Sequence, residues 1–146
     1  MSLGNVFASD MLKLFLNATP IADLAADDQT APATTLTVAL HTADPGEAGT
    51  QATNETAYTN YVRVTVARTS GGWAIAGGNP DPASASPVAN IDFAECGATP
   101  GAAITHFSVG TGVADYLMFS GTVTPNITMA TGVIPRLKTS STLQLD

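Results

Sequence analysis

Two runs within the segment Leu36–Arg68 constrain the fold more than any other part of the chain, because each alternates between large apolar residues and polar or small ones. This period of two is typical of half-buried antiparallel strands. It predicts two strands with one face in a core and the other toward solvent or a partner. The apolar positions are Leu36, Val38, Leu40, Val62, Val64 and Val66, and the opposing positions are Thr37, Ala39, His41, Arg63, Thr65 and Ala67.

Chain length and cysteine content narrow the class of protein. A chain of 146 residues fits one domain and is long enough to bury a core. We predict a single domain over 1–146, with an N-terminal helix and arm over 1–33 and a β-sandwich over 34–146. The single cysteine, Cys96, excludes an intrachain disulfide framework and a multi-cysteine zinc site. We interpret Cys96 as a small buried hydrophobic residue.

The charge balance argues against direct binding to nucleic acid. The net charge is −7, and only 12% of the residues are charged, about half the usual share. The few cations are too scattered to follow a phosphate backbone. An acidic surface suits a basic patch on a partner protein, or simple solubility. The cations are Lys13, Arg63, Arg68, Arg136 and Lys138.

A membrane partner is not expected either. The apolar run LKLFL at 12–16 is short, contains Lys13 and follows Asp10 closely. It lacks the basic region that precedes the apolar part of a secretory signal. Nothing in the sequence approaches the 18 or more apolar residues of a membrane-spanning helix.

A short amphipathic helix is predicted near the N-terminus. Phe7, Met11, Leu14 and Phe15 have the spacing of one helical stripe. Thr19 precedes Pro20, and a residue before proline avoids the helical region, so the helix should end there.

From residue 34 onward the pattern is that of strands separated by Gly and Pro turns. Such a series indicates a sandwich, a jelly roll or a Greek key. Tyr116–Phe119 is apolar at successive positions and predicts a central strand buried on both faces. The Gly77–Pro87 stretch is predicted to be a projecting loop. The predicted strands are Thr35–His41, Tyr61–Arg68, Gly72–Ala76, Val88–Phe93, Ile104–Val109, Tyr116–Thr124 and Thr139–Leu145.

Few residues suggest chemistry. His41, Asp44 and Glu47 could be metal ligands; alternatively, His41 ends a strand, Asp44 begins a turn and Glu47 is solvated. His106 fits a satisfied histidine within a sheet. Trp73 could stack on a sugar or lie in the core. We therefore predict no catalytic, cofactor-binding or metal-binding residue.

Several segments together resemble a family of small virion structural proteins of tailed phages. They are DMLKLFLNAT at Asp10–Thr19, LTVALHTADPG at Leu36–Gly46, YTNYVRVTVAR at Tyr58–Arg68, SPVANIDFA at Ser86–Ala94, ITHFSVGT at Ile104–Thr111 and LMFSGTVTP at Leu117–Pro125. Members are often labelled tail fibre proteins, and similar small β-proteins serve as capsid cement, such as the jelly-roll cement protein of a Bordetella podophage. The resemblance implies an all-β, jelly-roll-like antiparallel sandwich and brings no catalytic residues.

What the resemblance implies about function is a non-enzymatic virion protein synthesised in the host cytoplasm. We expect a capsid cement protein on the capsid surface that binds the major capsid protein, bridges capsomers and forms a homo-oligomer, a dimer or trimer. The alternative is a tail fibre or receptor-binding accessory protein that uses Trp73 and Gly77–Pro87. A small metal-dependent hydrolase built on His41, Asp44 and Glu47 is a third class. The candidate partner contacts are Phe7, Met11, Asp44, Glu47, Glu55 and Arg63.

The structural alternatives for two of these contact regions stay open. The N-terminal helix could form an adaptable arm that reaches the shell, or it could cover one open end of the sandwich. The acidic loop Asp44–Glu55 could meet a basic patch on the capsid, or it could simply be solvated.

Overall fold

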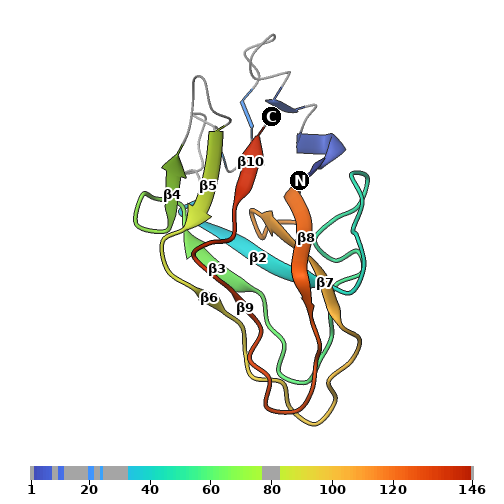
Figure 1. Ribbon diagram of the computed structural model, residues 1–146. Coiled ribbons are helices and arrows are strands. Elements are labelled where there is room, and N and C mark those ends of the chain that lie inside the picture. Colours follow the sequence, from blue (N-terminus) through green and yellow to red (C-terminus); the bar gives the residue numbers. More distant parts are fainter. Residues whose placement is uncertain are drawn as a thin grey trace.

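The computed structural model describes residues 2–7, 10–11, 20–21, 24, 33–76 and 83–145, and strands dominate them. Residues 5–7 and 10–11 are helical, which confirms a short N-terminal helix; Leu14 and Phe15 lie outside the described residues (Figure 1). The strands are β1 (Ser2–Leu3), β2 (Thr35–His41), β3 (Val64–Ala67), β4 (Trp73–Ala76), β5 (Ala83–Pro87), β6 (Ile91–Asp92), β7 (Ile104–Gly110), β8 (Leu117–Ile127), β9 (Arg136–Leu137) and β10 (Leu143–Leu145).

The larger sheet has five strands in the order β1-β8-β7-β2-β3, and every neighbouring pair is antiparallel. Val38 in β2 lies opposite Val64 in β3 and opposite Val109 in β7. β-branched side chains in facing positions pack well on a pleated surface. The alternating run that begins at Leu36 therefore becomes an inner strand of the sheet, as its pattern predicts.

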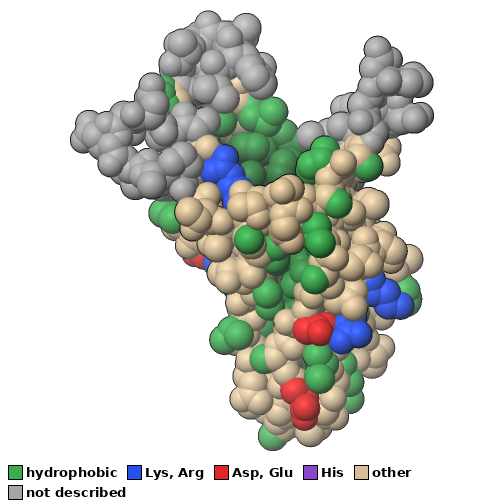
Figure 2. Space-filling view, turned by 90° about the vertical axis from the view of Figure 1, so that its left-hand side faces the viewer, with side chains coloured by type: hydrophobic (Ala, Val, Ile, Leu, Met, Phe, Trp, Pro, Cys, Tyr) green, Lys and Arg blue, Asp and Glu red, His purple; other side chains and the backbone are tan. Residues whose placement is uncertain are grey.

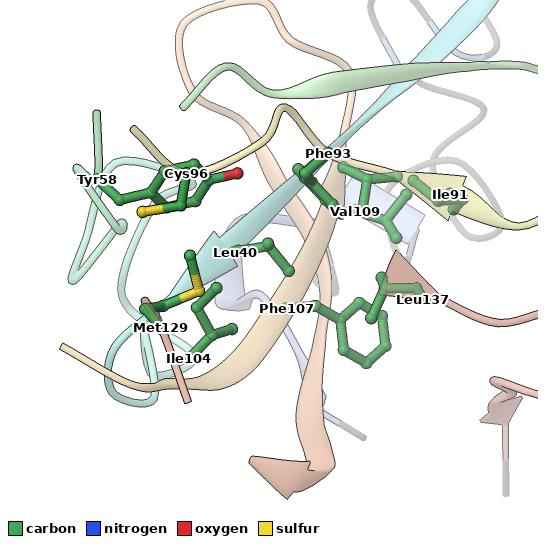
Figure 3. Close-up of a cluster of buried hydrophobic side chains, with 11 residues drawn as sticks. Leu40, Tyr58, Ile91, Phe93, Cys96, Ile104, Phe107, Val109, Met129 and Leu137 are labelled. Carbon is green, nitrogen blue, oxygen red and sulfur yellow. The ribbon is translucent and has the colours of Figure 1, made fainter. Parts of the chain in front are cut away.

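A second layer faces this sheet and consists of the three-stranded sheet β10-β5-β4 and the pair β6-β9. The chain crosses between layers after β3, after β6 and after β8. Figure 3 shows the core between the layers, where Leu40, Phe107 and Val109 meet Ile91 and Leu137. This arrangement confirms the antiparallel sandwich. The buried core residues are Val38, Leu40, Tyr58, Ile91, Phe93, Cys96, Ile104, Phe107, Val109, Met129 and Leu137.

The prediction of a projecting Gly77–Pro87 loop is wrong for Ala83–Pro87, and residues 77–82 lie outside the described part. Ala83–Pro87 is strand β5, in which Ala85 pairs with Ile75 of β4 and with Leu143 of β10. The Ala and Ser residues of β5 carry no strong apolar alternation, so the neighbouring strands on both sides determine its conformation. The predicted strand at Val88–Phe93 shrinks correspondingly to β6, Ile91–Asp92.

The second face of β2 was predicted to point toward solvent or a partner, and this prediction is wrong. Thr37 is 8% exposed, and Ala39 and His41 are fully buried. The segment 42–56 covers this face, and its Gln51 is also fully buried. β2 is therefore enclosed on both faces, by the core on one side and by a polar segment of its own chain on the other.

The predicted burial of Tyr116–Phe119 on both faces is confirmed by strand β8. Leu117 and Met118, which point to opposite faces, are both buried. Met118 belongs to a second, smaller cluster with Phe7, Ile21 and Leu24, and Phe119 packs against this cluster and the main core. The N-terminal residues thus cover one face of β8.

Candidate functional site

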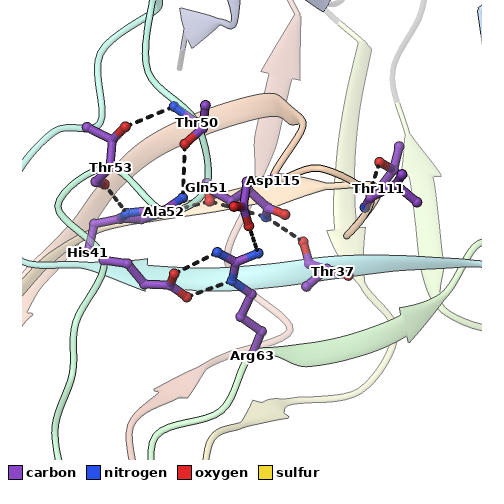
Figure 4. Close-up of polar contacts among 12 residues, drawn as sticks. Thr37, His41, Thr50, Gln51, Ala52, Thr53, Arg63, Thr111 and Asp115 are labelled. Carbon is purple, nitrogen blue, oxygen red and sulfur yellow. Dashed lines mark hydrogen bonds and ion pairs between the residues drawn. The ribbon is translucent and has the colours of Figure 1, made fainter.

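The covered face of β2 contains a buried polar network centred on His41 (Figure 4). His41 Nδ1 lies 2.9 Å from the carbonyl oxygen of Thr53, and His41 Nε2 lies 2.7 Å from Ser108 Oγ. A carbonyl oxygen only accepts, so Nδ1 carries the proton and Nε2 accepts from the Ser108 hydroxyl. Both ring nitrogens of a neutral imidazole are therefore used inside the fold.

Gln51 attaches the covering segment to the sheet beside this histidine. Its Nε2 donates to the carbonyl oxygen of Thr37 at 2.9 Å, and it lies 3.4 Å from Ser108 Oγ. A Cβ at Gly110 would lie 2.6 Å from Gln51 Cδ and 2.0 Å from the carbonyl oxygen of Tyr116. Position 110 must therefore be glycine for Gln51 to reach its place.

A serine hydroxyl beside a histidine can act as a nucleophile with its base, but this pair has no access to a substrate. His41 and Ser108 are fully buried, and burial lowers the pKa of His41, so the ring remains neutral. The pair stabilises the fold. Asp44 and Glu47 do not converge with His41, since no three His, Cys, Asp or Glu side chains within the described parts of the chain form a metal-sized group.

Arg63 joins two acidic residues from other parts of the chain. Its Nε and Nη2 donate to the two oxygens of Glu55 at 2.7 and 2.6 Å, and its Nη1 donates to Asp115 Oδ1 at 2.6 Å. The Tyr61 hydroxyl donates to Glu55 at 2.9 Å. These hydrogen bonds to Glu55 and Asp115 raise the pKa of Arg63. The charges of Glu55 and Arg63, both predicted as partner contacts, are thus neutralised within the chain.

Phe7 and Met11, the other apolar contact candidates, face the smaller cluster. Phe7 is 7% exposed and meets the rings of Tyr116 and Phe119 edge-on at 6.3 and 5.3 Å. Met11 packs against the same cluster. The Tyr116 hydroxyl donates to Asp10 Oδ2 at 2.8 Å. Of the two alternatives for the N-terminal helix, this geometry supports the one in which it covers the sandwich.

Asp44 and Glu47 present their side chains at the surface. Asp44 Oδ1 accepts a hydrogen bond from the amide of Gly46 at 2.9 Å, which closes a turn in which Gly46 has a φ of 72°. The backbone carbonyl of Glu47 accepts from the amide of Asn5 at 2.7 Å. Among the predicted contacts, these two carboxylates are the exposed ones.

An apolar groove of about 680 Å³ opens between the two layers of the sandwich at the end that carries β4. In the view of Figure 2, hydrophobic side chains gather in a hollow near the upper end of the molecule. We call this the apolar groove. Its apolar lining residues are Leu36, Trp73, Ala74, Ile75, Ala85, Val109, Phe119 and Leu143.

Trp73 lies at the inner side of the apolar groove. It is half-buried and packs against the main core, which supports the core interpretation over an exposed stacking surface. Its indole nitrogen is buried and has no hydrogen-bond partner in the structure. Most buried indole N–H groups do find a partner. Gln51 Oε1, beside His41, is likewise buried without one.

A second, polar groove of about 670 Å³ runs beside the later half of β8. Two of the few cations of the chain, Arg136 and Lys138, line it together with hydroxyl and amide side chains. Arg136 forms an ion pair with Asp92, in which Nη2 lies 2.9 Å from Oδ2. The neutral polar lining residues are Thr122, Thr124, Asn126, Ser140, Ser141 and Thr142.

Reasoning from the sequence missed both grooves and the partners of His41. Ser108 is 67 residues from His41, and no local pattern connects the two. The glycine at position 110, beside a strand end, was an available signal for a close approach, but it does not identify Gln51 as the approaching residue.

Within the described part of the chain, no helix is long and apolar enough to cross a membrane.

Comparison with known protein families gives a match. Residues 9–144 match the protein family described as podophage GP4 fiber I protein gp80. The search of curated proteins gave no match. The matched segment contains β2 to β9, both grooves and the His41 network.

Proposed function

The chain belongs to the podophage GP4 fiber I protein gp80 family, and from this we propose that it is a fibre component of a podophage virion. A role as a phage virion structural protein follows from the family. The observation that carries the finer proposal is the extent of the match, which runs over residues 9–144 and includes the whole core rather than one motif.

The architecture suits a compact module of a larger assembly. The described strands are short, and the longest, β8, has 11 residues. They form a two-layered sandwich around a buried core, which would give a fibre a folded base or tip rather than a shaft. As part of this proposal the protein self-associates, because a fibre presents several copies whose modest contacts add through avidity.

We also propose that the protein is not an enzyme. In the described residues, the pair that most nearly resembles catalytic chemistry is His41 and Ser108, and both are fully buried. The polar groove instead offers hydroxyl, amide and ammonium groups at the surface, which suit a receptor glycan. A receptor-binding accessory role in the fibre would use this groove.

Capsid cement is the second candidate function. The exposed carboxylates of Asp44 and Glu47 favour it, because they could meet a basic patch on the major capsid protein at the capsid surface. A shell is also held by many weak contacts repeated by symmetry. Phe7, Glu55 and Arg63 fit such a contact less well, since each has its interactions within the chain.

Antibody-gold labelling of intact phage particles, read by electron microscopy, separates the two functions. The fibre proposal predicts gold only at the tail side of the particle. Gold spread over the whole head would contradict it and establish the cement role. Particles without gold, with the protein left free in the lysate, would exclude both.

A further inference from the structure

Among the described residues, the outer edge of β4 has no partner strand. β4 ends the order β10-β5-β4, so no described strand lies on its other side. The register pairs Ile75 with Ala85, and the amide of Val88 donates to the carbonyl of Gly72 at 3.0 Å. Hydrogen-bonded and non-bonded pairs alternate along an antiparallel ladder. The N–H and C=O of Ile75 therefore point away from β5, whereas those of Ala74 and Ala76 point toward it.

The side chains of this edge are apolar and uncharged. Ile75 is 73% exposed, more than any other large hydrophobic residue described. Ala74 and Ala76 are exposed and small, which allows another backbone to approach closely. No charged residue occurs from Thr69 to Ala76. Soluble proteins usually protect such an edge with charges, so an unprotected one indicates a partner strand.

The other described sheet edges are better protected. β3 is flanked in the sequence by charged residues: Arg63 immediately precedes it and Arg68 immediately follows it. β1, β6 and β9 have two residues each and β10 has three, which limits the ladder that any of them can offer. The contrast singles out β4 as the edge that can accept another strand.

We propose that a second copy of this chain adds its own β4 antiparallel to this edge, with Ile75 opposite Ile75 of the second copy about a twofold axis. Directly opposed residues point to the same face of an antiparallel sheet, so the two isoleucines would pack side by side. Ile75 lines the apolar groove, and the pairing would therefore join the grooves of the two copies into one buried apolar surface. Such an interface is self-complementary, as a twofold contact requires.

The charge of the chain limits where a second copy can approach. Each copy carries a net charge of −7, so two copies repel wherever their acidic surfaces face each other. The uncharged edge from Thr69 to Ala76 is a place where they can meet without opposing carboxylates. The inference rests on the self-association in the proposed function and gives it a surface. It does not depend on whether the protein lies on the tail or the head.

Sedimentation velocity over a concentration series tests the inference. β4 has four residues, so we expect a weak dimer with a dissociation constant on the order of 10–100 µM. Ile75→Lys places a charge on the edge and should weaken dimerisation at least about tenfold. Ile134→Lys is the matched control, because Ile134 is 51% exposed but lies in a loop away from β4, and it should dimerise like the wild type.

Residue-resolved amide exchange adds a backbone readout. The amide of Ile75 should exchange more slowly as the concentration rises, whereas those of Ala74 and Ala76 are protected by β5 at every concentration. Circular dichroism of Ile75→Lys establishes that the variant is folded. A monomer at all concentrations, or an oligomer that Ile75→Lys leaves intact, would overturn the inference. Gold labelling of particles is independent of this result, so failure of the dimer and failure of the fibre proposal are distinguishable.

Discussion

The covered face of β2 and the apolar groove at β4 differ in how far the chain itself buries them. On the covered face, the segment 42–56 lies on the sheet, and both nitrogens of His41 have partners within the chain. At the groove, the Trp73 indole N–H is buried without a partner and Ile75 is 73% exposed. The first region is covered by the chain itself, although Gln51 Oε1 and Thr56 Oγ1 are buried there without a hydrogen-bond partner. The second has the features of a surface that a partner completes.

The largest expected effect comes from crowding the covered face. Gly110→Ala puts a methyl group against the Tyr116 carbonyl and Gln51, where a Cβ would lie 2.0 and 2.6 Å from them. We expect a loss of about 3 kcal/mol or more in the free energy of unfolding, measured by urea denaturation. Gly71→Ala, where the nearest atom is 3.5 Å away, is the control and should change little. Equal stability of the two variants would show that the covering segment is loosely packed.

Phe7→Ala tests whether the N-terminal residues are part of the fold. Phe7 is 7% exposed among Met118, Ile21 and Leu24, so its truncation should cost about 2–3 kcal/mol of unfolding free energy. Val6→Ala is the control, because Val6 is 62% exposed. Wild-type stability for Phe7→Ala, read from thermal or urea unfolding, would revive the alternative of a free arm.

Removing a charge from the Arg63 network should have a smaller effect. Glu55→Gln breaks a bidentate ion pair whose side chains are 21% and 18% exposed, and we expect a loss of about 1 kcal/mol. Asp92→Asn at the more exposed Arg136 pair should cause no measurable change. A double-mutant cycle with Arg63→Met isolates the pair, and a coupling indistinguishable from zero would contradict its role.

Acid should weaken the covered face through His41. Burial lowers the pKa of His41 in the folded protein below its ordinary value of 6.5. Between the folded and unfolded pKa values the unfolded chain binds more protons, so stability is full above about pH 6.5 and falls as the pH drops through this window. Urea unfolding at pH 7.5 and pH 5 should show a smaller loss for His41→Gln than for the wild type. The same loss in both would exclude His41 as the cause.

The smallest expected effect is that of Ile75→Lys on the stability of the monomer. An exposed side chain that touches little in one copy should change the unfolding free energy by less than about 0.5 kcal/mol. Thermal unfolding at a dilution where the protein is monomeric checks this. A marked destabilisation there would mean that Ile75 serves the chain's own fold, and it would remove the contrast between the two regions.

The sequence predicts the strands in which large apolar side chains alternate with polar ones. It does not predict a strand that consists of small residues. Thr35–His41 was predicted with the bounds that β2 has, because Leu36, Val38 and Leu40 carry the pattern. β5 was missed because Ala and Ser do not distinguish an inner strand from a loop. The burial of His41 was not predicted, because the segment 42–56, which covers it, has the polar composition of a solvated loop.

Long-range pairings limit what the sequence reveals about the candidate sites. Arg63 meets Asp115 across 52 residues, and His41 meets Ser108 across 67. Each residue alone is compatible with an exposed position on a strand or turn. The apolar groove likewise combines Leu36 and Phe119 with Trp73 and Leu143, which only the packing of two layers brings together.

A cryo-electron microscopy reconstruction of a particle that carries this chain tests the central claim most directly, because it shows both location and contacts. We predict that the sandwich lies in a tail-side fibre, with β4 edges of two copies paired at Ile75 and the segment 42–56 closed over each β2. Copies spread over the capsid shell with β4 open to solvent would contradict the account.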